Sequence, residues 1–471
     1  ALIQPANYEE HLALLAGCDL VIEAIAERMD WKLDLYTKVA PHIAPTAIVA
    51  SNTSGLSITQ LSAALPESLK AQFCGIHFFN PPRYMQLVEL IPTPSTRPQI
   101  LDDLESFATR TLGKGVVRAK DTPNFVANRV GIAGMLATIA EAAKAGLSYD
   151  VVDDLTGKKL GRASSGTFRT ADVVGIDTMA HVMKTMQDNL QADPFYASYA
   201  TPAAVQALIA AGALGQKAKA GFFKKVGKDV LRFDPATNDY VPAGKKADPL
   251  VDRILKKPAA ERLKLLREST HPQAQFLWAI LRNGFHYVAV HLAEIADSAR
   301  EVDFAMRWGF GMKQGPFELW QEAGWLEVAK MVQEDIAAGK ALSNAPLPDW
   351  VFKGPVADAG GVHSPQGSWN PTAGVFQPRH VLPVHTRQHF PETVLGSQAQ
   401  GFQTAGKTLH EVNQAIDQAR LALGAVHRLL DQAEHLDDPA LVQALQTLPP
   451  LLRRDEGLLT AVWPQDPAAV M

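Results

Sequence analysis

The chain has 471 residues, of which 47% are hydrophobic and 20% are charged, and its formal net charge at pH 7 is −4. This composition indicates a folded chain of about two to four domains and argues against disorder and against a nucleic-acid partner. No apolar run approaches the roughly 18 residues that a membrane span requires. Two cysteines, Cys18 and Cys74, lie in apolar stretches. They indicate buried thiols of a reducing compartment such as the cytoplasm, rather than a disulfide or a metal site.

The first segments of the chain alternate between strand-like and helix-like patterns. Residues 19–27 read as a strand with acidic residues near its end, and Lys32 lies in the helix predicted to follow. Residues 46–50 form a second apolar strand, which runs into the hydroxyl-rich stretch 51–55. Small hydroxyl residues at the end of a strand suit a ligand contact in an α/β crevice, although they are also ordinary turn residues.

The segment from Cys74 to Pro81 ends an apolar run with a histidine, His77. Glu89 follows twelve residues later, inside a second apolar run. A carboxylate is costly to bury unless it is paired. If the two runs are neighbouring strands, Glu89 can orient the imidazole of His77 and stabilise its protonated form, which makes His77 a candidate general base. The alternative is a satisfied core histidine beside an edge-strand carboxylate.

Downstream, Val116 and Val117 belong to another predicted strand, and a helix is predicted to begin with Thr122 as its cap and Pro123 as its first residue. This helix carries Asn128 next to Arg129. An asparagine in an otherwise apolar helix either faces solvent or contacts a ligand.

Four motifs in this order resemble a known family: VIEAIAE (21–27), SNTSGL (51–56), HFFNPPRYMQLVELI (77–91) and KDTPNFVANRV (120–130). The chain is similar to the L-3-hydroxyacyl-CoA dehydrogenases of fatty-acid β-oxidation over roughly residues 10 to 330. The resemblance implies an α/β fold, with a Rossmann-like doubly wound domain followed by duplicated all-α dehydrogenase C-terminal domains and a helical tail.

The resemblance also implies an activity, which is the NAD-dependent oxidation of L-3-hydroxyacyl-CoA to 3-oxoacyl-CoA. His77 would be the general base assisted by Glu89, and Ser54 and Asn128 would hold the oxygen atoms of the acyl-CoA substrate. No metal is expected. Six residues match positions that contact NAD in the family: Ile25, Ala26, Glu27, Lys32, Ser54 and Asn80.

One departure from the family is large, because no G-x-G-x-x-G fingerprint occurs in the sequence. Gly309-Phe310-Gly311 has the wrong spacing. We expect an N-terminally incomplete nucleotide domain, with an unpaired edge at residues 21–25 and weak NAD binding. The alternative is a catalytically impaired acyl-CoA-binding or scaffold relative. Another Rossmann-type hydroxy-acid dehydrogenase is a third reading, which the His77 and Glu89 pair disfavours.

The pattern predicts a division of the chain into six parts. These are a partial NAD-binding domain (1–118), a helical dehydrogenase domain (119–225), a polar linker (226–272), a second helical repeat (273–345), an extended arm (346–400) and a helical hairpin tail (401–471). The second repeat echoes the first at an interval of about 150 residues, and Arg282 matches Arg129. It lacks an evident polar constellation, which favours a structural role over an independent binding domain. The expected assembly is a pseudo-dimer of the two repeats or a homo-oligomer.

The predicted arm and tail carry two further patterns. His380, His385 and His389 are five and four residues apart, which is not a usual spacing of metal ligands, so solvated loop histidines are favoured over a metal site. Residues 409–433 show an apolar stripe in steps of three and four, which predicts a docked hairpin or, alternatively, an oligomerisation coiled coil. No hydratase oxyanion-hole segment is recognised.

Overall fold

The computed structural model describes residues 3–385. All of these residues belong to one compact unit. The predicted hairpin tail, His389 and the last part of the predicted arm lie outside the described residues.

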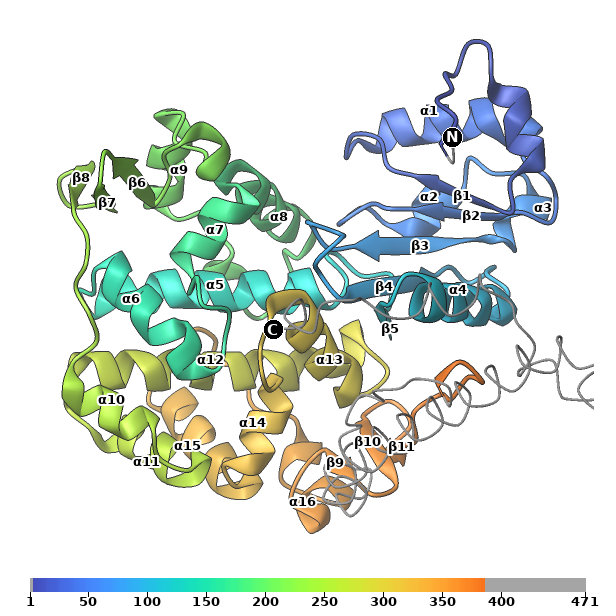
Figure 1. Cartoon of the computed structure of the whole chain (residues 1–471). Coiled ribbons are helices and arrows are strands. Elements are labelled where there is room, and N and C mark those ends of the chain that lie inside the picture. The colour runs from blue at the N-terminus through green and yellow to red at the C-terminus, as the bar shows by residue number, and fades with distance from the viewer. Residues whose placement is uncertain (1–2, 386–471) are drawn as a thin grey trace, which may run out of the picture. The chain divides into compact units, whose positions relative to one another are not determined.

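The N-terminal part is a five-stranded sheet in the order β1-β2-β3-β4-β5 (Figure 1). All neighbours are parallel except β3 and β4, which are antiparallel. The strands are β1 (Leu20–Glu23), β2 (Ile48–Ser51), β3 (Phe73–Phe78), β4 (Leu87–Pro92) and β5 (Gly115–Arg118). The helices of this part are α1 (Met29–Val39), α2 (Ile58–Ser62), α3 (Glu67–Lys70) and α4 (Pro98–Thr111). This arrangement confirms the Rossmann-like fold class.

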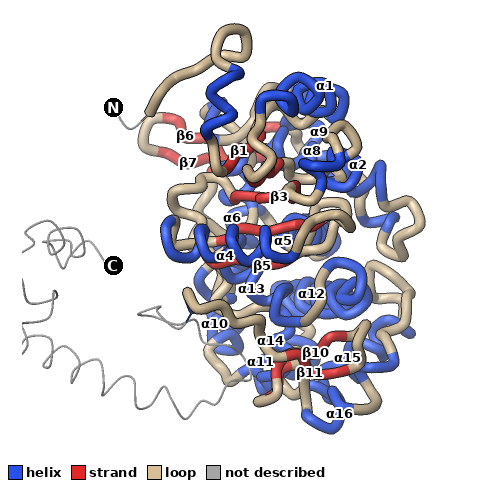
Figure 2. The backbone as a smooth tube through the Cα atoms, turned by 90° about the vertical axis from the view of Figure 1, so that its right-hand side faces the viewer, coloured by secondary structure: helices blue, strands red, loops and turns tan. Residues whose placement is uncertain are grey.

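Successive residues of each strand face opposite sides of the sheet. Cys74 and Val88 pack on the side covered by α4, which lies across β4 and β5 (Figure 2). Phe73 and Leu87 pack on the other side, with α2 and the helical part of the chain. His77 and Glu89 share the parity of Phe73 and Leu87, so both face the helical part.

Two predicted boundaries are wrong. The first predicted strand ends at Glu23, because the chain after it turns to hydrogen-bond the Glu23 carboxylate. The predicted helix start at Thr122 and Pro123 is replaced by a turn in which Asn124 and Phe125 have positive φ angles of 64° and 51°. Helix α5 begins only at Ala127.

Two sets of helices follow, as the internal repeat predicts. The first set is α5 (Ala127–Lys144), α6 (Tyr149–Thr156), α7 (Phe168–Val174), α8 (Ile176–Asn189) and α9 (Ala203–Ala210). The second is α12 (Pro272–Ile295), α13 (Ala299–Phe310), α14 (Pro316–Glu322) and α15 (Trp325–Ala337). Helices α5 and α12 pack along each other (Figure 1). The repeat extends to single bonds, since Asp153 accepts the Phe168 N–H at 2.6 Å and Asp303 accepts the Phe317 N–H at 2.9 Å.

The predicted linker is a structured segment. It contains the helices α10 (Pro249–Leu255) and α11 (Ala259–Glu268) and two strands, β7 (Asp229–Asp234) and β8 (Asp239–Pro242). With β6 (Phe223–Val226), which precedes the segment and ends at its first residue, these strands form a three-stranded antiparallel sheet. The polar composition of this segment led to the prediction of a linker, but polar groups of the segment form hydrogen bonds with the first repeat. The backbone N–H groups of Gly244 and Lys245 both donate to Asp150 at 2.8 Å.

The predicted extended arm is also folded where the structure describes it. Residues 355–377 form α16 (Pro355–Ala359), β9 (His363–Ser364), β10 (Gly367–Asn370) and β11 (Val375–Gln377). His380 and His385 pair with Asp102 and Glu105 of α4 at 3.1 and 3.3 Å. The side chain of His385 is only 7% exposed, so the expectation of a solvated loop histidine is wrong there.

Two remaining expectations concern the thiols and the membrane. Cys74 is buried, and burial raises the pKa of its thiol to about 12. Cys18 is partly exposed and precedes β1, so its predicted burial in a strand is wrong. Among the helices of residues 3–385, none has both the length and the apolar character to cross a bilayer.

Candidate active site

His77 and Glu89 face each other directly across the antiparallel pair β3 and β4. Nδ1 of His77 lies 2.8 Å from Oε2 of Glu89. Both residues are buried, with 3% and 0% of their surfaces exposed. The expectation that the two apolar runs are neighbouring strands is therefore confirmed. A carboxylate on Nδ1 selects the tautomer that leaves Nε2 free to accept a proton.

The second oxygen of Glu89 holds the start of α5. Oε1 accepts hydrogen bonds from the backbone N–H groups of Val126 and Ala127 at 3.1 and 2.8 Å. These N–H groups belong to the first turn of a helix, where no intrahelical partner exists and a negative charge is stabilised. A single buried carboxylate thus orients the imidazole and caps the helix that carries Asn128, which explains why α5 begins later than the sequence predicts.

Two aromatic rings enclose the imidazole of His77. Its ring centroid lies 4.5 Å from that of Phe79 and 5.6 Å from that of Phe125. Phe125 reaches this position through its positive φ angle in the turn before α5. The two rings limit water around His77, which strengthens its interaction with Glu89.

Ser54 lies in the loop after β2, and Glu27 holds this loop in place. Oε1 of Glu27 accepts hydrogen bonds from the N–H groups of Ser54 and Gly55 at 2.9 and 3.0 Å and from the hydroxyl of Thr53 at 2.5 Å. Because β1 and β2 are parallel, their carboxyl ends meet at the same edge of the sheet. Glu27 and Ser54 therefore converge where doubly wound sheets bind their ligands.

Lys32 lies beneath this edge with none of its surface exposed. Its ammonium is 2.7 Å from Oε1 of Glu23 and 3.8 Å from Oε2 of Glu27. Glu23 also accepts hydrogen bonds from Tyr36 and Ser51 at 3.0 and 2.7 Å. The cluster ties α1 to β1 and β2, and sequence reasoning missed Glu23 as its centre. An acidic residue at the end of an apolar strand was the only available signal.

The other predicted site residues are placed around the same edge. Ile25 is half-buried and Ala26 exposed in the turn after β1, and Asn80 is exposed after β3. Asn128 is half-buried in the first turn of α5. The roles of these residues in binding NAD or substrate stay predictions.

Arg129, next to Asn128, belongs to a buried cluster that sequence reasoning also missed. Its guanidinium lies 2.7 Å from Asp193 and 3.2 Å from Glu294, and it donates to the Tyr287 hydroxyl at 2.7 Å. His291 lies 2.8 Å from the same Asp193 oxygen. Asp193, His291 and Glu294 group as metal ligands often do, but here the Arg129 guanidinium lies against both carboxylates. The charged partners are too far apart in sequence to be recognised.

The second repeat carries buried polar clusters as well, so the expectation that it lacks a polar constellation is wrong. Arg282 lies 3.2 Å from Asp335, which also accepts the indole N–H of Trp278 at 2.6 Å. Asp303 lies 2.7 Å from Nε2 of His363. These contacts join elements of the fold to one another and are consistent with a structural role for the repeat.

The mostly parallel sheet, the helical unit behind it and the His77–Glu89 pair between them are the arrangement of a Rossmann-like nucleotide-binding domain joined to a helical domain. A family model described as "3-hydroxyacyl-CoA dehydrogenase, NAD binding domain" matches residues 1–122. The model described as "3-hydroxyacyl-CoA dehydrogenase, C-terminal domain" matches residues 125–225. The chain belongs to the 3-hydroxyacyl-CoA dehydrogenase family.

Curated relatives agree with this assignment. The chain is 38% identical over 350 residues to a probable 3-hydroxyacyl-CoA dehydrogenase of Bacillus subtilis. The aligned region covers 74% of this chain and 43% of that protein. It is 34% identical over 220 residues to the human mitochondrial hydroxyacyl-coenzyme A dehydrogenase, which covers 46% of this chain and 68% of that protein. The chain thus spans less than half the length of the Bacillus relative.

A solved structure shares the fold. The 3-hydroxybutyryl-CoA dehydrogenase of Escherichia coli K12 superposes with a TM-score of 0.53 over 70% of this chain and 79% of that chain, at 21% identity. At this identity the likeness shows the fold alone.

Proposed function

We propose that this protein oxidises L-3-hydroxyacyl-CoA to 3-oxoacyl-CoA with NAD, as a step of fatty-acid β-oxidation. The observation that carries the proposal is the buried His77–Glu89 pair, in which Nδ1 and the carboxylate are 2.8 Å apart. Such a pair is costly to bury and orients one imidazole nitrogen for proton transfer. Family membership indicates which alcohol supplies the proton.

In the proposed reaction, Nε2 of His77 takes the proton of the 3-hydroxyl group, and the carboxylate of Glu89 stabilises the imidazolium that forms. NAD, when bound at the carboxyl ends of β1 and β2, would supply the acceptor for the hydride that leaves C3 of the substrate. The hydroxyl carbon becomes a ketone, and one proton and one hydride are removed in balance. Ser54 and Asn128 would hold the substrate oxygens.

The carboxyl ends of β1 and β2 fit a dinucleotide. Ala26 is exposed there, and Glu27 fixes the loop of Ser54 through three hydrogen bonds. Ile25, Ala26, Glu27, Ser54 and Asn80 would contact NAD, and Lys32 would support them without contacting it. The ammonium of Lys32 is already paired with Glu23 and donates to the Ile25 carbonyl. We therefore assign Lys32 the role of holding the turn after β1 in place.

We also infer a cytoplasmic location and an assembly in which the two helical repeats replace a homodimer. The two free cysteines support the first inference. The packing of α5 along α12 within one chain supports the second. Analytical ultracentrifugation of the purified protein measures the oligomeric state, and a dimer would contradict the second inference.

The test of the proposed function is the oxidation of NADH by a 3-oxoacyl-CoA, followed by NADH absorbance with the purified protein. His77→Gln should lower turnover by about 100- to 10,000-fold, because the base is lost. NADH binding and thermal unfolding should change little. His181→Gln, at an exposed position of α8, is the matched control. A wild-type protein that binds acyl-CoA without turnover would instead favour the acyl-CoA-binding or scaffold alternative.

A further inference from the structure

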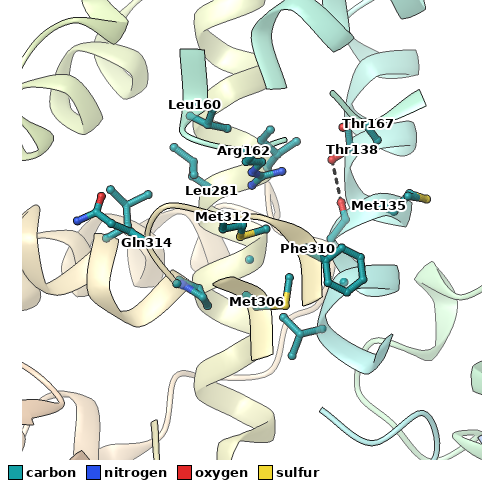
Figure 3. A pocket seen from close by; sticks show the side chains of 18 of the residues that line it. Met135, Thr138, Leu160, Arg162, Thr167, Leu281, Met306, Phe310, Met312 and Gln314 are labelled. Carbon is teal, nitrogen blue, oxygen red and sulfur yellow. Dashed lines mark hydrogen bonds between the residues drawn. The ribbon is translucent and has the colours of Figure 1, made fainter. Parts of the chain in front are cut away.

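The inner and outer sides of the helical part differ in what they offer to a partner. On the inner side, the side chains between α5 and α12 form the contact of the two repeats (Figure 3). The hydroxyl groups of Thr138 and Thr170 there donate to carbonyls of the protein itself, at 2.8 and 2.5 Å. On the outer side, the hairpin of β6 and β7 lies at the edge of the helical part, away from the sheet with the proposed dehydrogenase site (Figure 1).

The segment 215–246, which includes this hairpin and β8, carries a strong local charge. It contains eight basic and three acidic residues, which gives a net charge of +5 in a chain whose total is −4. The segment therefore has the opposite sign of charge from the rest of the chain. Such an asymmetry favours contact with an anionic partner.

Most of the lysines in this segment are available for such a contact. Five of them are exposed and have no carboxylate oxygen within 4 Å among residues 3–385: Lys219, Lys224, Lys225, Lys228 and Lys245. Lys217 and Lys246, by contrast, pair with Asp177 and Asp154 at 2.7 and 3.3 Å.

Strand pairing brings the five lysines together in space. Lys224 and Lys225 lie in β6, and Lys228 lies in the turn to β7. An antiparallel bridge between Ala220 and Lys224 places Lys219 beside β6. The Ala243 N–H donates to the Val230 carbonyl at 3.0 Å, which places Lys245 beside β7. The lysines therefore surround one hairpin.

The tip of the hairpin also exposes apolar side chains. Val226 is 50% exposed and Val230 is 41% exposed. Residues two apart in a strand share a face, and so do residues paired across two strands. Val226 therefore lies on the same face as Lys224, and Val230 lies on the same face as Lys225. Each face of the tip combines one apolar and one cationic side chain.

Three explanations for this surface can be compared. Lysines on exposed strands prevent a sheet edge from pairing with other chains, but this role needs no apolar tip. A stable protein partner would need a larger surface, since such interfaces bury about 1,200–2,000 Å². An anionic lipid surface suits both features, because its headgroups attract each lysine and its interface accepts small apolar side chains.

We propose that the β6–β7 hairpin binds the surface of membranes that contain anionic lipids. The side chains of Val226 and Val230 enter the headgroup region, and the surrounding lysines contact the lipid phosphates. The attachment is peripheral and needs neither NAD nor turnover.

Co-sedimentation of the purified protein with lipid vesicles tests the proposal. Wild type should bind phosphatidylcholine vesicles that contain about 30% phosphatidylglycerol and should not bind phosphatidylcholine alone. Salt at about 0.5 M should release it, because the attraction is screened. The triple variant Lys224→Gln, Lys225→Gln, Lys228→Gln should bind on the order of 100-fold more weakly, since each lysine contributes about a factor of five.

The matched control is the triple variant Lys256→Gln, Lys264→Gln, Lys330→Gln, which makes the same change in net charge at exposed positions outside the segment. It should bind within about threefold of wild type, because those lysines lie outside the proposed contact. Both triple variants should unfold at the wild-type temperature, since they change exposed side chains only.

A further variant, Val226→Ser with Val230→Ser, tests the apolar part of the contact. It should bind about tenfold more weakly and keep the dependence on salt, because it removes apolar side chains and no charge.

Failure of wild type to bind anionic vesicles would overturn the proposal. An equal loss in both triple variants would do so as well, because it would show an attraction that depends on net charge alone. Binding to polyglutamate through Lys224, Lys225 and Lys228, without binding to vesicles, would assign the hairpin to an acidic protein instead and would also overturn it.

Discussion

The carboxylate of Glu89 accepts a 2.8 Å hydrogen bond from the backbone N–H of Ala127 while its other oxygen lies 2.8 Å from His77. The residue that orients the proposed base therefore also fixes the first turn of α5. The sheet and the helical repeat are joined at the point where the proposed chemistry takes place. A change at Glu89 should consequently affect both the proton transfer and the position of Asn128.

Glu89→Gln should lower turnover by about 100- to 10,000-fold. The amide keeps the size of the side chain, but its NH₂ group would donate to Nδ1 of His77 and select the tautomer that carries a proton on Nε2. That tautomer cannot accept the substrate proton. Steady-state kinetics of 3-hydroxyacyl-CoA oxidation at saturating NAD measure the effect, and far-UV circular dichroism checks the fold. Turnover within a factor of three of wild type would remove Glu89 from the mechanism.

Asn128→Ala should lower turnover without lowering stability. Asn128 is half-buried in the first turn of α5, and alanine has the better helix propensity. The expected result is a loss in kcat for 3-oxoacyl-CoA reduction, with a melting temperature equal to that of wild type or higher. Unchanged kcat would place Asn128 outside the substrate site.

Arg129→Met should destabilise the protein by about 3–5 kcal/mol, because it leaves Asp193 and Glu294 without their buried cation. Urea unfolding monitored by tryptophan fluorescence measures the change. Arg253→Met removes an arginine at an exposed position and serves as the control. A loss below 1 kcal/mol would show that the Arg129 cluster does not stabilise the contact of α5 with α12.

His286 should make the stability depend on pH. It lies buried in α12 with Nε2 2.7 Å from the Ala345 carbonyl, and burial lowers the pKa of its imidazole from 6.5 to about 4. The unfolded chain binds a proton below pH 6.5, whereas the folded protein does not until about pH 4. The free energy of unfolding should therefore fall between pH 6.5 and 4, by on the order of 3 kcal/mol from this group.

His286→Gln should remove this part of the slope, since glutamine does not titrate and its amide can still donate to the carbonyl. Urea titrations at pH 7, 5.5 and 4 are expected to show a flatter profile for the variant, in order-of-magnitude agreement with the shift in the pKa. His181→Gln, at an exposed histidine of α8, should keep the wild-type slope. An identical slope for His286→Gln and wild type would rule out the buried imidazole as its origin.

Several features of this protein follow from local sequence alone. Alternating apolar runs predict the strands, and a carboxylate inside such a run demands a partner, which led to His77 and Glu89. The interval of about 150 residues between similar motifs predicts the two helical repeats. The alternation of apolar and polar residues repeats every few residues, so it can be recognised in the sequence without knowledge of the fold.

Only the tertiary structure decided the rest. The start of α5 depends on Glu89, more than 30 residues away in the sequence, because a carboxylate of the sheet replaces the predicted cap at Thr122. The polar stretch 226–272 is fixed to the first repeat through Asp150, which accepts hydrogen bonds from two of its backbone N–H groups. The partners of Arg129, Asp193 and Glu294, likewise come from distant parts of the sequence. The energy of a buried charge depends on what surrounds it in space, and local sequence does not specify those neighbours.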